Sequence, residues 1–141
     1  MIESESSEGQ ATLPQPTILV VDDEPAVRSY VGNILRREGY QLVEAVDGVD
    51  AMERAHQAPR VDLVVTDIRM PRMDGIALAR AITEYRPHTP ILYISGYPFD
   101  SEATGQPEGI CASLAKPFTR RALLDAVAKC LPAPAAGGNA A

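Results

Sequence analysis

Residues 61–75 read Val-Asp-Leu-Val-Val-Thr-Asp-Ile-Arg-Met-Pro-Arg-Met-Asp-Gly. The apolar run 63–65 predicts a strand that is buried on both faces, and Pro71 and Gly75 prevent the strand from continuing far beyond Asp67. This places a carboxylate at the carboxyl end of a central strand, the edge at which open α/β sheets bind ligands. An isolated Asp could equally cap the next turn, so the ends of the other strands must decide between the two interpretations.

The composition is that of a globular protein. The chain has 141 residues, of which 45% are hydrophobic and 23% are charged, and this suits one domain with its own core. It contains neither a run as long as a membrane span nor the basic-then-apolar order of a signal peptide, so we expect a cytoplasmic protein that does not bind membranes. The net charge of −6, to which Glu3, Glu5 and Glu8 contribute, makes nucleic acid a poor partner.

Two cysteines occur, Cys111 and Cys130. They lack CxxC spacing, and His56 and His88 are far from both in the sequence. A disulfide or a zinc site is therefore not expected, and we predict two small buried hydrophobic residues instead.

Short apolar runs alternate with segments of helical spacing along the chain. The runs predict strands at 17–21, 41–45, 63–67, 91–94 and 110–115. Helices are expected from Pro25 to just before Gly39, over 48–57 after an Asp47 cap, after Asp74-Gly75, and after a Thr119 cap. Gly and Pro crowd residues 100–109, so the fourth of five helices should be short or irregular. We expect disordered tails at 1–16 and 132–141 around one domain at 17–131, with a doubly wound, five-stranded parallel sheet.

Polar and charged side chains follow four of the five strands. They are Asp22 with Asp23, Asp67, Ser95 and Lys116. In a sheet of order 2-1-3-4-5 these groups would meet in one crevice. Each pair of clustered carboxylates at roughly 4–5 Å would cost about 3–4 kcal/mol, which a hard divalent cation such as Mg²⁺ would relieve. The set predicts a metal-assisted phosphoryl site with a carboxylate nucleophile.

From about Thr17 to Leu131 the chain resembles the receiver domains of two-component response regulators. The matching segments, in order and at the spacing of that family, are Val20-Val21-Asp22-Asp23-Glu24-Pro25, Asp67-Ile68-Arg69-Met70-Pro71-Arg72-Met73-Asp74-Gly75, Ser95-Gly96 and Lys116-Pro117-Phe118. The resemblance implies a flavodoxin-like fold and a signalling domain that is not an enzyme in the usual sense. The chain is similar to stand-alone receivers of the chemotaxis type and to the receivers of hybrid kinases.

The resemblance also implies roles for individual residues. Asp67 would accept a phosphoryl group, with Lys116 and Ser95 holding its oxygens. Asp23, Asp67 and the backbone carbonyl of Arg69 would bind Mg²⁺, with Asp22 acting through a bound water. The remaining expectations are Ile68 and Gly96 as further cofactor-binding residues and a cis Lys116-Pro117 peptide bond.

One position departs from the family pattern. The third residue before the active lysine is aromatic in many receivers, but here it is Ser113. Tyr97 is a candidate substitute, and we expect phosphorylation to draw Ser95 and Tyr97 inward and to reshape residues 98–109.

The expected partners are a histidine kinase or a histidine phosphotransfer protein and an output protein that the sequence does not identify, with the chain a monomer or a weak dimer. Two alternatives stay open. A small Mg²⁺-dependent phosphatase with an aspartate nucleophile would combine similar residues, although such enzymes place the nucleophile after the first strand. A receiver-like interaction module that is never phosphorylated is the other alternative.

Overall fold

The computed structural model describes residues 15–96 and 110–131. Five strands and four helices lie in these ranges, in the order β1 (Thr17–Val21), α1 (Pro25–Arg37), β2 (Gln41–Ala45), α2 (Gly48–Gln57), β3 (Leu63–Asp67), α3 (Gly75–Tyr85), β4 (Ile91–Ser95), β5 (Ile110–Ala115) and α5 (Arg120–Cys130). The expected strands and helices are confirmed at these positions. Residues 1–14 of the first predicted tail, the second tail at 132–141, the weak helix at 100–109 and Tyr97 lie outside the described residues.

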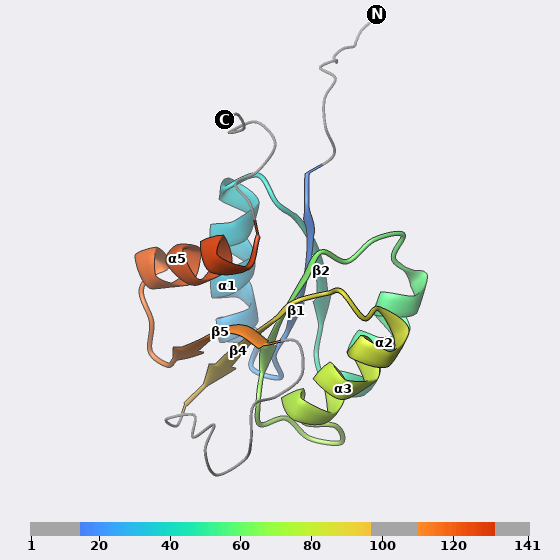
Figure 1. Ribbon diagram of the computed structural model, residues 1–141. Helices are drawn as coiled ribbons and strands as arrows, with labels where there is room; N and C mark the ends of the chain where they lie inside the picture. The colour runs from blue at the N-terminus through green and yellow to red at the C-terminus, as the bar shows by residue number, and fades with distance from the viewer. Residues whose placement is uncertain (1–14, 97–109, 132–141) are drawn as a thin grey trace, which may run out of the picture.

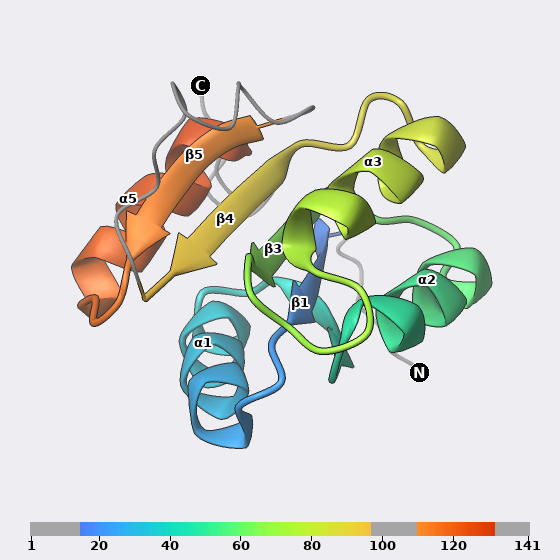
Figure 2. The same cartoon turned by 90° about the horizontal axis from the view of Figure 1, so that it is seen from below.

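The strands form one parallel sheet in the order β2-β1-β3-β4-β5, as predicted. Helices α1 and α5 lie on one face and α2 and α3 on the other (Figures 1 and 2). None of the helices in the described parts of the chain is long and apolar enough to cross a membrane.

Both faces of the central strands are apolar, which explains the near-continuous hydrophobic runs in the sequence. On β1, Ile18 and Val20 pack under α1 and α5, whereas Leu19 and Val21 pack under α2 and α3. All five residues of β3 are buried. The carboxyl end of β3 is therefore held in place by packing on both faces.

Side chains cap three of the helices, two of them at the caps that the sequence predicts, Asp47 and Thr119. Asp47, Asp74 and Thr119 each accept a hydrogen bond from the backbone N–H three residues later, at 2.8, 2.8 and 3.0 Å. Each cap satisfies an N–H group that has no partner within its helix. The Lys116-Pro117 peptide bond is cis, as expected.

The prediction for the cysteines was wrong, because Cys111 on β5 and Cys130 at the end of α5 form a disulfide. Helix α5 returns across the sheet antiparallel to β5, and this brings the Cα atoms of two residues 19 apart in sequence to 5.4 Å. Such a separation suits a disulfide. Sequence spacing could not show it, because the proximity depends on how a helix packs on its preceding strand.

Candidate phosphoryl and metal site

The candidate site lies at the carboxyl ends of the parallel strands, which we call the carboxyl edge of the sheet. Asp22 follows β1 directly, and Asp67 is the last residue of β3. These two strands are neighbours, with Val21 in register with Thr66. Lys116 follows β5, and its backbone N–H donates to the Ser95 carbonyl at 2.8 Å. The sheet therefore brings residues that are far apart in sequence to one edge.

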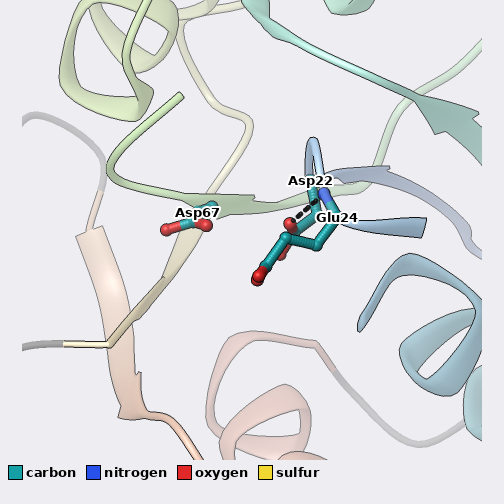
Figure 3. A group of neighbouring side chains, drawn as sticks. All are labelled: Asp22, Glu24 and Asp67. Atoms are coloured by element: carbon teal, nitrogen blue, oxygen red, sulfur yellow. Dashed lines mark hydrogen bonds between the residues drawn. The ribbon is translucent and has the colours of Figure 1, made fainter. Parts of the chain in front are cut away.

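Three carboxylates cluster at this edge (Figure 3). Asp22, Glu24 and Asp67 each offer an oxygen, and these oxygens lie within 4.8 Å of one another. The Asp22 Oδ1 atom accepts a hydrogen bond from the Glu24 backbone N–H at 2.9 Å. The Asp22 Oδ2 atom is buried, with no hydrogen-bond partner among the residues that the structure describes. A buried carboxylate oxygen in this state favours a nearby cation, and the cation that the structure shows is the Lys116 ammonium at 3.4 Å.

Lys116 supplies the positive charge of the cluster. Its Nζ atom lies 3.0 Å from Asp67 Oδ2, 3.0 Å from Glu24 Oε1 and 3.4 Å from Asp22 Oδ2. Although burial lowers the pKa of Lys116, its hydrogen bonds to Glu24 and Asp67 outweigh that effect and raise the pKa above its usual value. Lys116 is therefore protonated at neutral pH.

One ammonium does not balance the three carboxylates. When all are ionised, the cluster keeps two negative charges, and burial together with the charge of Asp67 raises the pKa of Asp22. A divalent cation has the charge needed to balance the cluster, and oxygen donors are those that Mg²⁺ and Ca²⁺ prefer. The donor set thus fits a hard divalent ion.

A close backbone approach shapes the loop after Asp67. The Arg69 N–H donates to Asp67 Oδ1 at 3.3 Å, and the Gly75 N–H donates to the Ile68 carbonyl at 2.7 Å. A Cβ atom on Gly75 would lie 2.2 Å from the Asp67 carbonyl oxygen, which is too close for any side chain. Glycine is therefore required at position 75 for the loop to pass behind Asp67.

The predicted site residues do not all lie in the same place. A cavity of about 370 Å³ is lined by Asp23, Glu24, Asp67, Arg69, Gly96 and Lys116. Asp23 thus faces the cavity but is not a member of the carboxylate cluster, where Glu24 is found instead. Ser95 ends β4 and is buried, whereas the side chain of Ile68 packs against the core under α2 and α3.

Glu24 is the functional candidate that the sequence prediction missed. It is the third acidic residue after β1 and the residue that precedes α1. The run Asp22-Asp23-Glu24 was a signal for it, but the sequence did not show which of the three carboxylates would turn toward Lys116.

Position 113 has no ring. Ser113 is in register with the buried Tyr93 of β4, so the β5 position that is aromatic in many receivers carries a hydroxyl here. The substitution that the sequence showed therefore lies within the sheet, next to the strand that ends in Ser95.

The comparisons with known proteins agree with this geometry. The sequence model of the response regulator receiver domain family matches residues 18–128 of this chain. The chain is 37% identical over 124 residues to the chemotaxis protein CheY of Treponema pallidum, covering 81% of each chain. It is 37% identical over 117 residues to the sensor kinase CckA of Brucella abortus, covering 82% of this chain but only 12% of that protein.

A solved structure shares the fold. The response regulator protein TrrA of Thermotoga maritima, in complex with Mg²⁺-BeF, has a TM-score of 0.72 and 29% identity, covering 82% of this chain and 99% of that one. The strand order, the acidic cluster and the family match therefore lead to the same assignment. The chain belongs to the response regulator receiver domain family, with its flavodoxin-like fold.

Proposed function

We propose that Asp67 accepts a phosphoryl group, with Mg²⁺ as cofactor, in a two-component phosphorelay. The observation that carries the proposal is the position of Lys116 Nζ, 3.0 Å from Asp67 Oδ2, next to two further carboxylates. A structural ion pair would need one carboxylate for one ammonium. Asp22 and Asp67 are buried, whereas Glu24 is exposed, so two buried carboxylates share one ammonium. That excess of buried negative charge is costly for folding, and it suits a site that receives a metal ion and an anion together.

The residues that would hold Mg²⁺ are Asp23, Asp67 and the backbone carbonyl of Arg69, with Asp22 contributing through a water. The ion would supply positive charge that neutralises the phosphoryl oxygens. Asp22 Oδ2 is buried and, among the described residues, has only the Lys116 ammonium at 3.4 Å near it. This oxygen and the Mg²⁺-BeF complex of TrrA support the assignment. Glu24 belongs to the same cluster and would give up its contact with Lys116 when the phosphoryl group enters.

In the proposed transfer, an Asp67 oxygen forms a bond to phosphorus while the P–N bond of a phosphohistidine donor breaks. The imidazole leaves with the electron pair of that bond. Lys116 and the Ser95 hydroxyl would hold the phosphoryl oxygens, and Gly96 lines the cavity that receives them. The protein contributes position and charge, so we expect neither a diffusible product of its own nor turnover of generic phosphate esters.

The donor would be a histidine kinase or a histidine phosphotransfer protein. Output would follow through protein contact or through further phosphate relay. The relationships to CheY and to the kinase CckA support this part of the proposal.

The proposal is tested by incubating the purified chain with phosphoramidate and Mg²⁺ and measuring its intact mass. We expect the wild type to gain the mass of one phosphoryl group, and both Asp67→Asn and wild type in a chelator to gain none. Ser113→Ala is a matched control on β5, and it should take up the group as the wild type does. An equal mass gain in Asp67→Asn would contradict the assignment.

A further inference from the structure

The loop between β3 and α3 is fastened to the first turn of α2. The guanidinium of Arg72 contacts the Asp47 carboxylate with two nitrogens, Nε at 3.1 Å and Nη2 in a still closer contact. The side chain of Asp47 is only 8% exposed. Both nitrogens contact the same oxygen, Asp47 Oδ2, and the Arg72 side chain is 61% exposed. The contact is therefore a hydrogen-bonded ion pair in which only the carboxylate is buried.

The backbone of Arg72 supports the importance of this contact. With φ of 71°, Arg72 is the one non-glycine residue in the left-handed region within the described ranges. Arginine has no local preference for that conformation, whereas Gly or Asn would adopt it at lower cost. The loop therefore keeps an unfavourable backbone conformation at the residue whose side chain reaches Asp47.

Backbone packing fixes the same junction. A Cβ atom on Gly48 would lie 2.7 Å from both the Cβ and the carbonyl oxygen of Met73, so the loop lies directly against the start of α2. Asp47 also caps α2 through the Asp50 N–H at 2.8 Å. This N–H, followed by the hydrogen bond and charge of Arg72, holds the pKa of Asp47 below its usual value despite burial. Asp47 is therefore ionised and paired at neutral pH.

The fastened residue is close in sequence to the reacting group. Arg72 lies five positions after Asp67 and three after Arg69, whose N–H donates to Asp67 Oδ1. Beyond Arg72, the loop closes through the hydrogen bond from Gly75 to Ile68. A shift of the loop at Arg72 would thus move the backbone of Arg69 relative to Asp67.

We propose that Asp47 and Arg72 are positioning residues for the phosphoryl site, which hold the β3–α3 loop so that the Arg69 carbonyl and the Asp67 carboxylate face the metal position together. This inference rests on the proposed function. Neither residue touches the reacting atoms. Their effect is on how well the site binds Mg²⁺, and supporting residues around metal sites commonly change metal affinity by 10- to 100-fold.

The test uses two variants that preserve local structure. Arg72→Asn keeps a residue that tolerates the left-handed backbone, and Asp47→Ser keeps an oxygen that can cap α2. Titration calorimetry with Mg²⁺ alone should show roughly tenfold weaker binding in each variant. The double variant should be no weaker than either single one, because both changes remove the same contact. Arg36→Gln, which breaks the pair with Glu44 away from the loop, should bind like the wild type.

Two further readouts separate positioning from general stability. Without metal, amide exchange should be faster in both variants in the peptide that spans 68–74, but not in peptides from β1. At saturating Mg²⁺ the variants should regain phosphoryl uptake close to that of the wild type, since the deficit lies in metal affinity.

The possible failures are distinguishable. A wild type that binds no Mg²⁺ would contradict the proposed function and this inference with it. Wild-type binding that Arg72→Asn and Asp47→Ser both retain within twofold, even with a lowered melting temperature, would contradict the positioning role alone.

Discussion

Each end of the β1–β3 strand pair carries an aspartate, but the two aspartates differ in how well their oxygens are hydrogen-bonded. At the amino ends, Asp62 accepts the Thr17 N–H at 2.7 Å and two hydrogen bonds from Arg60 at 2.8 and 2.9 Å. At the carboxyl ends, Asp22 has an oxygen with no hydrogen-bond partner in the described structure and competes for Lys116 with two other carboxylates.

The pKa values shift in opposite directions as a result. Burial raises the pKa of Asp22, and the nearby Asp67 raises it further. Burial also acts on Asp62, but the hydrogen bonds from Arg60 and Thr17 outweigh it and lower the pKa. Asp62 is therefore a satisfied structural carboxylate. A carboxylate that is kept where it opposes folding, as Asp22 is, marks the functional end of the sheet.

The largest effect should follow a change in the loop behind Asp67. Gly75→Ala places a Cβ atom 2.2 Å from a backbone oxygen, so we expect a loss of about 4 kcal/mol in the free energy of unfolding, beyond the usual cost of overpacking. Gly32→Ala in α1 is the control. Its nearest neighbours are side-chain ends at 3.1 Å or more, and alanine favours the helix, so stability should change by less than about 1 kcal/mol. Urea denaturation measures both, and equal losses would contradict this account of the loop.

The disulfide tests whether the amino ends of the strands are purely structural. Cys111 lies near the amino end of β5, and the bond closes a loop with a sequence separation of 19. Replacing both cysteines by serine should cost about 3 kcal/mol. A thiol reductant should lower the wild type to the same stability and leave the double variant unchanged. Phosphoryl uptake should stay at the wild-type level in the double variant. A loss of uptake would contradict the view that the amino ends of the strands are structural and the carboxyl ends functional.

A smaller effect of opposite sign should distinguish the two aspartates. At neutral pH and without metal, Asp22→Asn should raise the free energy of unfolding by about 1 kcal/mol, because it removes one of three clustered charges. Asp62→Asn should lower it by about 1 kcal/mol, because the pairing with Arg60 is weakened. Chemical denaturation of both variants checks the signs, and a loss of stability in Asp22→Asn would contradict the comparison.

The pH dependence of the same two variants sharpens this test. A raised folded pKa means that folded Asp22 binds its proton more tightly than the unfolded chain does, so the wild type loses stability as the pH rises through that pKa. The higher free energy of unfolding that we expect for Asp22→Asn should therefore vanish at low pH. Asp62 has a lowered folded pKa, so its contribution is present above its ordinary pKa of 3.8 and disappears as the pH falls through the folded pKa.

The sequence was sufficient for the positions of the strands, and the resemblance to receiver domains supplied their order in the sheet. Buried parallel strands produce continuous apolar runs, and a charged residue that follows such a run must lie at the sheet edge. For this reason the sequence, together with that strand order, predicted that Asp22, Asp67 and Lys116 lie at one edge, and the structure places them in contact there. The caps Asp47 and Thr119 were predictable because capping is a local interaction between residues three positions apart.

The features that the sequence did not predict all depend on tertiary packing. The Cys111–Cys130 bond requires α5 to return across β5, and the contact between Arg72 and Asp47 joins loops 25 residues apart. Glu24 was visible as an acidic residue, but its turn toward Lys116 depends on the path of the chain between β1 and α1. Single-residue patterns contain no information about these longer-range contacts.

The central claim is that Asp67, and no neighbouring carboxylate, forms the bond to phosphorus. The most direct measurement is reduction of the phosphorylated chain with borohydride, which converts an acyl phosphate to an alcohol, followed by peptide mass spectrometry. We predict that position 67 alone is converted to homoserine, in a Mg²⁺-dependent manner. Conversion at Asp22, Asp23 or Glu24 with Asp67 intact would contradict the account.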